Sequence, residues 1–170
     1  FDAGMLYYTP QIWCSDNTDA IERVKIQYGT SFAYPSCTVG SHVSAVPNHQ
    51  TGRMTELATR AAVAMAGSYE LDLNLLTEEE KEQVREQIKN YHRFEMLIRQ
   101  GRYYRLTDVW QTKEYAAWEY CAPDESEALV TVITMDTQCN PATEYVKLRG
   151  LGEDKKYRVE VVGMQTDGEN

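Results

Sequence analysis

The hydrophobic periodicity of the chain changes near Tyr103, and this change constrains the fold more than any other feature. Before it, apolar strand-like segments alternate with segments whose apolar residues recur at helical spacing. After it, apolar and polar residues alternate one by one, which is typical of half-buried strands. The sequence therefore predicts an α/β region followed by a small antiparallel β-sheet or β-sandwich. The predicted strands cover residues 5–13, 31–46 and 68–73 in the first region and 115–121, 129–135, 145–149 and 157–161 in the second, and the predicted helices cover residues 17–28, 51–66 and 77–100.

The third predicted helix carries its own start signal. In Thr77-Glu78-Glu79-Glu80, the threonine hydroxyl is expected to accept a hydrogen bond from the amide of Glu80, whose side chain reaches back to Thr77. The three glutamates also suit the positive end of the helix dipole. Gly101 is expected to end this helix.

An acidic run stands where the first strand-like segment ends and the first helix begins. Asp16 follows the apolar stretch that ends at Trp13 and precedes the helical face that starts with Ile21. Ser15 or Asp16 can serve simply as the helix N-cap, and the spacing alone favours that interpretation. The functional alternative is a catalytic acid, because the carboxyl ends of strands in α/β proteins border the active site.

A wider pattern surrounds this acid. The arrangement Ser15-Asp16-x-x-Asp19-x-x-x-Arg23 resembles the signature of family 36 glycoside hydrolases, the bacterial α-galactosidases. The resemblance is close over residues 1–76 and weak beyond. Further blocks at residues 1–13, 25–31, 40–53 and 69–74 resemble the stretches that flank the signature, in the same order.

The resemblance implies a two-part architecture, α/β plus all-β. Residues 1–108 are expected to form the C-terminal part of a (β/α)8 TIM barrel, the catalytic domain, and residues 109–170 a C-terminal antiparallel β-domain. A complete barrel of this type needs about 250 residues. The chain of 170 residues is therefore expected to be a fragment that folds beside the remainder of the same enzyme and is inactive alone.

The resemblance also implies roles for the residues of the signature. The family's retaining mechanism uses two carboxylates about 5–5.5 Å apart. Asp16 is expected to be the general acid/base, and the nucleophile is expected to lie outside this chain. Asp19 and Arg23 lie four residues apart, a spacing that pairs side chains on one helical face, and are expected to orient the loop, with Arg23 also reaching Asp16. Ser15 is expected to cap the helix or to touch a sugar hydroxyl.

Trp13, His42 and Asn48 are candidate substrate contacts, because each is expected near the mouth of the barrel. Trp13 is also expected to shield Asp16 from water. For His42 a hydrogen-bonded structural role is the favoured alternative, and Asn is a residue type that often serves only to form turns. Three aromatic residues of the β-region are expected in the core rather than stacked on a sugar: Trp110, Trp118 and Tyr120.

Composition and charge narrow the class of partner. A net charge of −9 and a pI near 4.8 argue against nucleic acid. The chain has no run of 18 apolar residues, which argues against a membrane span. Its four cysteines lack the paired spacings of metal or redox sites, so no metal or other cofactor is expected and a reducing, cytoplasmic setting is favoured. By resemblance, α-galactosides are the expected ligands and a homo-oligomer, a tetramer, the expected assembly.

Three functions stay open. The first is the acid/base part of a retaining α-galactosidase that acts on melibiose- or raffinose-type sugars. The second is a transglycosidase or an α-N-acetylgalactosaminidase of the same fold. The third is a non-catalytic carbohydrate-binding or structural module.

Overall fold

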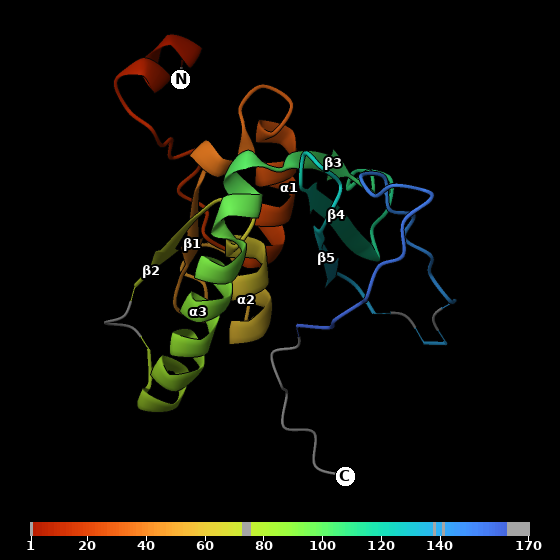
Figure 1. Ribbon diagram of the computed structural model, residues 1–170. Helices are drawn as coiled ribbons and strands as arrows, with labels where there is room; N and C mark the ends of the chain where they lie inside the picture. The colour runs from red at the N-terminus through yellow and green to blue at the C-terminus, as the bar shows by residue number, and fades with distance from the viewer. Residues whose placement is uncertain (1, 73–75, 138, 141, 163–170) are drawn as a thin grey trace.

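The chain folds into two sheets with helices packed between them (Figure 1). The structure, a computed structural model, describes residues 2–72, 76–137, 139–140 and 142–162. Its helices are η1 (Ala3–Tyr7), α1 (Ala20–Thr30), η2 (Ser36–Thr38), α2 (Leu57–Ala64) and α3 (Glu78–Gln100), and its strands are β1 (Gly40–Val43), β2 (Ser68–Leu71), β3 (Arg102–Arg105), β4 (Tyr115–Cys121) and β5 (Ala128–Thr134).

A parallel pair of strands forms the first sheet. β1 pairs with β2, with His42 opposite Glu70, and Ile12 adds a parallel bridge to Val39 on the other side of β1. Three parallel segments thus lie in chain order, with α1 and α2 in the connections. This arrangement confirms the predicted α/β character of the first region.

The first predicted strand, residues 5–13, is wrong apart from the bridge at Ile12. Residues 3–7 instead form the 3₁₀ helix η1, whose N-cap Asp2 accepts a hydrogen bond from the amide of Gly4. This helix buries none of its residues, and Tyr7 is 87% exposed. Pro10 has no amide hydrogen for a strand ladder. With neither a buried face nor a full set of donors, the segment has little to gain from strand pairing.

The second strand and second helix are shorter than predicted. α1 continues to Thr30, and the turn of η2 takes up residues 36–38, so that β1 begins only at Gly40. Residues 51–56 are not helical, because Asn48 organises them into a turn: its side-chain oxygen accepts hydrogen bonds from the amides of Gln50 and Thr51. The third predicted strand corresponds to β2, and its last residue, 73, lies outside the described residues.

The capping box of α3 is confirmed. The hydroxyl of Thr77 accepts a 3.2 Å hydrogen bond from the amide of Glu80, and the Glu80 carboxylate accepts a 3.0 Å bond from the amide of Thr77. Gly101 follows the last residue of the helix, also as predicted. Buried residues of α3 belong to two hydrophobic cores. Val84 packs in the first core, on the side of β1 and β2, and Leu97 and Ile98 pack in the second, on the side of β4 and β5.

The second sheet is antiparallel, with the order β3–β4–β5, as the alternating pattern predicted. The two later strands, predicted at residues 145–149 and 157–161, are wrong: these residues are described and adopt no strand. Val159 and Val161 alternate with polar residues, yet both are 87% exposed. Alternation stabilises a strand only when one face is covered, and no described element covers this one. Within the described residues, the β-region is therefore a single sheet and not a sandwich.

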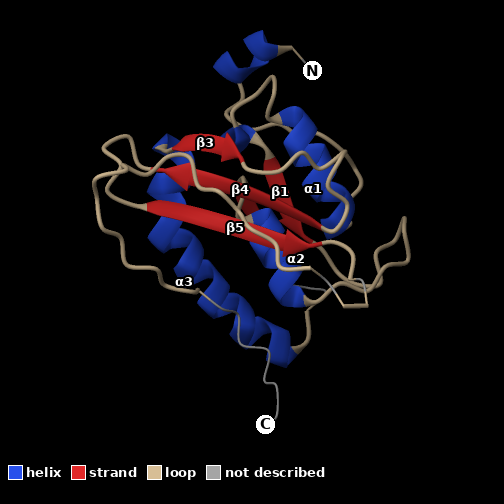
Figure 2. Cartoon of the chain, turned by 90° about the vertical axis from the view of Figure 1, so that its right-hand side faces the viewer, coloured by secondary structure: helices blue, strands red, loops and turns tan. Residues whose placement is uncertain are grey.

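The helices form the middle layer of the molecule. In Figure 1, β1 and β2 lie to the left of α1 and α2 and β3–β5 to their right, and Figure 2 shows the antiparallel sheet lying in front of α2 and α3. One core joins the helices to β1 and β2, and the other joins them to β4 and β5. Trp118 and Tyr120 belong to the second core, as predicted, but Trp110 is 58% exposed because it lies on a loop against Phe32 and Tyr28 rather than in the sheet. No described helix is long and apolar enough to cross a membrane.

Candidate functional site

Asp16 lies on the loop between the bridge at Ile12 and the first turn of α1. Its side chain is exposed, and its Oδ1 accepts a 3.0 Å hydrogen bond from the indole Nε1 of Trp13. Trp13 is itself 47% exposed. The loop turns at Ser15, whose hydroxyl accepts a hydrogen bond from the amide of Asn17. The carboxylate is therefore oriented by an aromatic neighbour and open to a ligand.

The N-cap of α1 is Asp19, and neither Ser15 nor Asp16 caps the helix as the spacing suggested. The Oδ1 atom of Asp19 accepts 3.0 Å hydrogen bonds from the amides of Ile21 and Glu22. Asp19 is 2% exposed, so its carboxylate is buried and not accessible to a ligand. Because Asp19 caps the helix, the carboxylate of Asp16 is left free for another role.

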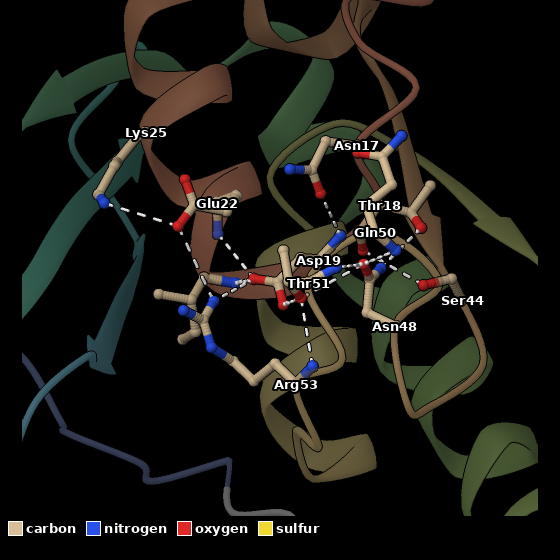
Figure 3. Close-up of polar contacts among 11 residues, drawn as sticks. Asn17, Thr18, Asp19, Glu22, Lys25, Ser44, Asn48, Gln50, Thr51 and Arg53 are labelled. Atoms are coloured by element: carbon tan, nitrogen blue, oxygen red, sulfur yellow. Dashed lines mark hydrogen bonds and ion pairs between the residues drawn. The ribbon is translucent and has the colours of Figure 1, made fainter.

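The charge partner of Asp19 comes from a loop 34 residues away. Arg53 Nη1 donates to Asp19 Oδ1, and the Thr51 hydroxyl donates to Oδ2 at 2.7 Å (Figure 3). Burial alone would raise the pKa of Asp19, but the hydrogen bonds from the Glu22 amide and Thr51 and the charge of Arg53 outweigh it, so that the pKa lies below its ordinary value. The predicted pair of Asp19 with Arg23 is wrong, since these residues share only the helical bond between backbone atoms.

Asn48 ties the same loop to the residue before the cap. It is 4% exposed, and its Nδ2 donates to the hydroxyl of Thr18 at 3.2 Å. The Ser44 hydroxyl donates to the Thr18 carbonyl (Figure 3), and Gln50 Nε2 lies 3.5 Å from the carbonyl oxygen of Asp16. Asn48 thus lies inside the loop with its polar atoms bonded to protein.

Arg23 is 1% exposed and bonds to backbone carbonyls rather than to carboxylates. Its Nη1 donates to the Ser15 carbonyl at 3.2 Å, and its Nη2 donates to the Gly40 carbonyl at the start of β1. Its guanidinium also lies 5.6 Å from the ring centroid of Trp13. Arg23 therefore fastens the loop to the sheet at Ser15, and the expected contact with Asp16 is not formed.

A second polar group lies on the face of β1 that points away from the helices. Ser41 and Val43 face α1 and α2, so His42 must face the other way. His42 Nδ1 lies 3.5 Å from the Oε2 of Glu70, and its ring meets that of Trp13 edge to face at 5.8 Å. Trp13 is thus the link between the His42–Glu70 pair and Asp16.

Sequence reasoning missed Glu70 and Arg53. Glu70 follows from strand parity, because a residue paired with His42 in a parallel register shares its face. No local signal identifies Arg53, which reaches Asp19 only through the turn that Asn48 forms. Among the described residues no group of three His, Cys, Asp or Glu side chains is placed to hold a metal ion.

Two family models match the chain. The Melibiase model matches residues 1–101, and the model of the glycosyl hydrolase family 36 C-terminal domain matches residues 115–170. The chain belongs to the Melibiase family. The Melibiase match covers α1 to α3 with the signature around Asp16, and the C-terminal match starts at β4.

Relatives of this Melibiase chain carry α-galactosidase names. It is 56% identical to the bifunctional α-galactosidase/sucrose kinase AgaSK of Mediterraneibacter gnavus over 99% of the chain and 18% of that protein. It is 48% identical to α-galactosidase AgaA of Geobacillus stearothermophilus over 96% of the chain and 23% of that protein. The chain therefore spans only about a fifth of the length of these relatives.

Solved structures agree with the fold. The galactosidase domain of AgaSK superposes with a TM-score of 0.83 at 59% identity, covering 89% of this chain and 21% of that one. A variant of the Geobacillus family 36 enzyme AgaA in complex with raffinose superposes with a TM-score of 0.84 at 48% identity, over 89% of this chain and 21% of that one. Another AgaA variant was solved with stachyose.

Proposed function

We propose that this Melibiase chain supplies the general acid/base of a retaining α-galactosidase, and that Asp16 is that residue. The free carboxylate of Asp16 carries the proposal: it is exposed beside an indole donor while Asp19 does the capping. Family membership and the α-galactosidase names of the relatives support the reaction class.

The proposed fold is the closing sector of a (β/α)8 barrel over residues 1–108, followed by the C-terminal β-domain at residues 109–170. The parallel order Ile12, β1, β2, with α1 and α2 in the connections, supports the barrel. The remainder of the enzyme would add the other strands and the nucleophile, which a retaining mechanism needs about 5–5.5 Å from the acid/base.

In this mechanism Asp16 gives its proton to the glycosidic oxygen as the bond to the anomeric carbon breaks. It then takes a proton from the water that releases the sugar from the nucleophile. Trp13, half exposed beside Asp16, is proposed to contact the sugar, with His42 next to it on the inner face of β1. Ser15 and Arg23 hold the loop backbone, and Asn48 the neighbouring turn.

Asp16→Asn in the enzyme that carries this chain tests the assignment. Turnover of raffinose should fall by about 10²- to 10⁴-fold, the usual contribution of general acid–base catalysis. An aryl α-galactoside whose leaving group needs no protonation should lose much less in the bond-breaking step. Asp124→Asn, at an exposed turn, is the matched control. Full raffinose turnover in Asp16→Asn would refute the assignment.

Substrate, assembly and compartment are further proposals. Terminal α-galactosides are proposed because relatives were solved with raffinose and stachyose, and activity on an α-N-acetylgalactosaminide or transfer to an acceptor sugar would favour the alternatives. The 170 residues alone should not turn over an aryl α-galactoside, because we place only one of the two catalytic carboxylates on them.

A homotetramer is proposed by family resemblance, and the mass of the protein in solution tests it. A cytoplasmic location is supported by the four free cysteines and is testable by thiol titration of the native protein.

A further inference from the structure

We propose that Thr51 and Arg53 are positioning residues for the acid/base, and that they act through Asp19 on the loop that carries Asp16. This inference rests on the proposed role of Asp16. We refer to the hydrogen bonds and the ion pair between residues 44–53 and residues 16–19 as the loop clasp; Figure 3 shows those made by Thr18 and Asp19.

The centre of the loop clasp is the buried carboxylate of Asp19. Its Oδ1 atom accepts hydrogen bonds from two amides in the first turn of α1. Arg53 donates to the same oxygen, Oδ1, and the Thr51 hydroxyl donates to the other oxygen, Oδ2, at 2.7 Å. An N-cap needs only the first set of bonds. The second set therefore does something besides start the helix: it fixes the position of the loop at 44–53 relative to the helix end.

The same two loops are joined again on the Asp16 side of Asp19. Asn48 donates to the Thr18 side chain, and Ser44 donates to the Thr18 carbonyl. The carbonyl of Asp16 itself lies 3.5 Å from Gln50 Nε2. The Thr51 hydroxyl also lies 3.3 Å from Asn48 Oδ1, so the contacts on Asp19 and those on Thr18 form one network.

The carboxylate of Asp16 has little other support. Among the described residues its side chain makes one hydrogen bond, to Trp13, whose ring is half exposed. Its place is therefore set mainly by its backbone, which is held by Arg23 at Ser15 and by the loop clasp at residues 16–19. A general acid must lie within hydrogen-bond reach of the atom it protonates. A displacement of about 1 Å can cost about a hundredfold in rate.

The variants Thr51→Val and Arg53→Gln in the complete enzyme remove the outer contacts of Asp19 while leaving the N-cap bonds in place. Turnover of raffinose should fall by between about tenfold and a hundredfold. Turnover of an aryl α-galactoside with a dinitrophenolate leaving group should change much less, because that group leaves without a proton. Thr51→Ser, which keeps the hydroxyl, should restore raffinose turnover. Arg99→Gln, which breaks an exposed ion pair on α3, is the control.

A double-mutant cycle with Asp16→Asn separates this inference from the proposed function. If the loop clasp acts through Asp16, then Thr51→Val should cause no further loss on raffinose in the Asp16→Asn background. Equal losses on both substrates, or losses that add to those of Asp16→Asn, would overturn the positioning role and leave the clasp as a stabilising contact. If Asp16→Asn alone keeps raffinose turnover, the proposed function fails instead. Thermal midpoints of the variants show whether a loss in rate follows a loss in stability.

Discussion

The hydroxyl of Tyr120 in β4 donates a 2.6 Å hydrogen bond to the carbonyl of Ala66, a residue 54 positions earlier at the end of the α2 region. The same hydroxyl shares a 2.8 Å hydrogen bond with Ser36, just before β1. Tyr120 is 1% exposed, and burial raises the pKa of its phenol. One side chain of the antiparallel sheet therefore joins the segments that lead into both parallel strands.

Tyr120→Phe should reduce the free energy of unfolding by about 1–3 kcal/mol, because the Ala66 carbonyl stays buried without its donor. Urea unfolding of the protein with and without the substitution measures this difference. Tyr145→Phe, at a position that is 86% exposed, should change stability by less than about 0.5 kcal/mol. A loss no larger for Tyr120→Phe than for Tyr145→Phe would show that the contact does not join the layers.

Gly150→Ala should destabilise the protein by about 1–3 kcal/mol through overpacking. A Cβ atom at Gly150 would lie 2.3 Å from the Cβ of Cys121 and 2.9 Å from a carboxylate oxygen of Glu119. Glu119 is fully buried and accepts hydrogen bonds from the amides of Arg149 and Gly150, so the segment cannot move away without losing them. Gly29→Ala is the control, since its Cβ would make only ordinary contact with Trp110. Equal thermal midpoints for the two variants would contradict the prediction.

Glu80→Gln should lower stability at neutral pH by about 1 kcal/mol. The hydrogen bond from the Thr77 amide, together with the charge of Arg60, holds the pKa of Glu80 below its ordinary value of 4.5. A lowered folded-state pKa stabilises the fold above the unfolded-state pKa, and this contribution disappears as the pH falls through the folded-state value.

The difference between the wild-type protein and Glu80→Gln should therefore shrink as the pH falls below about 4.5. Unfolding curves at several pH values measure it. Glu79→Gln, in the same first turn of α3 but outside the capping box, is the control. A difference that stays constant down to low pH would mean that the ionised form of Glu80 is not what stabilises the capping box.

Arg23→Lys should destabilise the protein by about 1–3 kcal/mol even though it keeps the charge. The guanidinium donates to two carbonyls, of Ser15 and Gly40, from two different nitrogens. A lysine ammonium is a single point donor on a flexible stem and cannot replace the fork. Chemical unfolding measures the loss, with Arg99→Lys on the exposed face of α3 as the control. Equal stability of the two variants would mean that the fork is not needed.

Sequence signals confined to neighbouring residues correctly predicted helix α3 and strands β4 and β5. The capping box of Thr77 and Glu80 starts α3 at the expected residue, and β4 and β5 lie within one residue of their predicted positions. The family resemblance around Asp16 is confirmed by the Melibiase match. Each of these signals lies within a short stretch of sequence, so it can be read without knowing the tertiary structure.

The predictions failed where the structure depends on contacts between residues far apart in the sequence. The spacing of Asp19 and Arg23 suggested a helical pair, but Asp19 is paired with Arg53, and Arg23 bonds to the backbone carbonyls of Ser15 and of Gly40 in β1. Alternation at residues 157–161 suggested a strand, but alternation does not reveal whether anything covers its apolar face. Both errors concern tertiary partners, which periodicity does not encode.

The amino and carboxyl ends of the parallel strands make different kinds of contact. Tyr120 holds Ser36 and Ala66 at the amino ends of β1 and β2, whereas Asp16 and the loop clasp lie beyond the carboxyl end of β1. In the (β/α)8 barrel that we propose, the first end is expected to govern stability and the second to govern chemistry. If the proposed function holds, directed evolution can mutate the two ends in separate libraries: changes around β4 should alter heat tolerance, and changes in residues 44–53 should alter turnover.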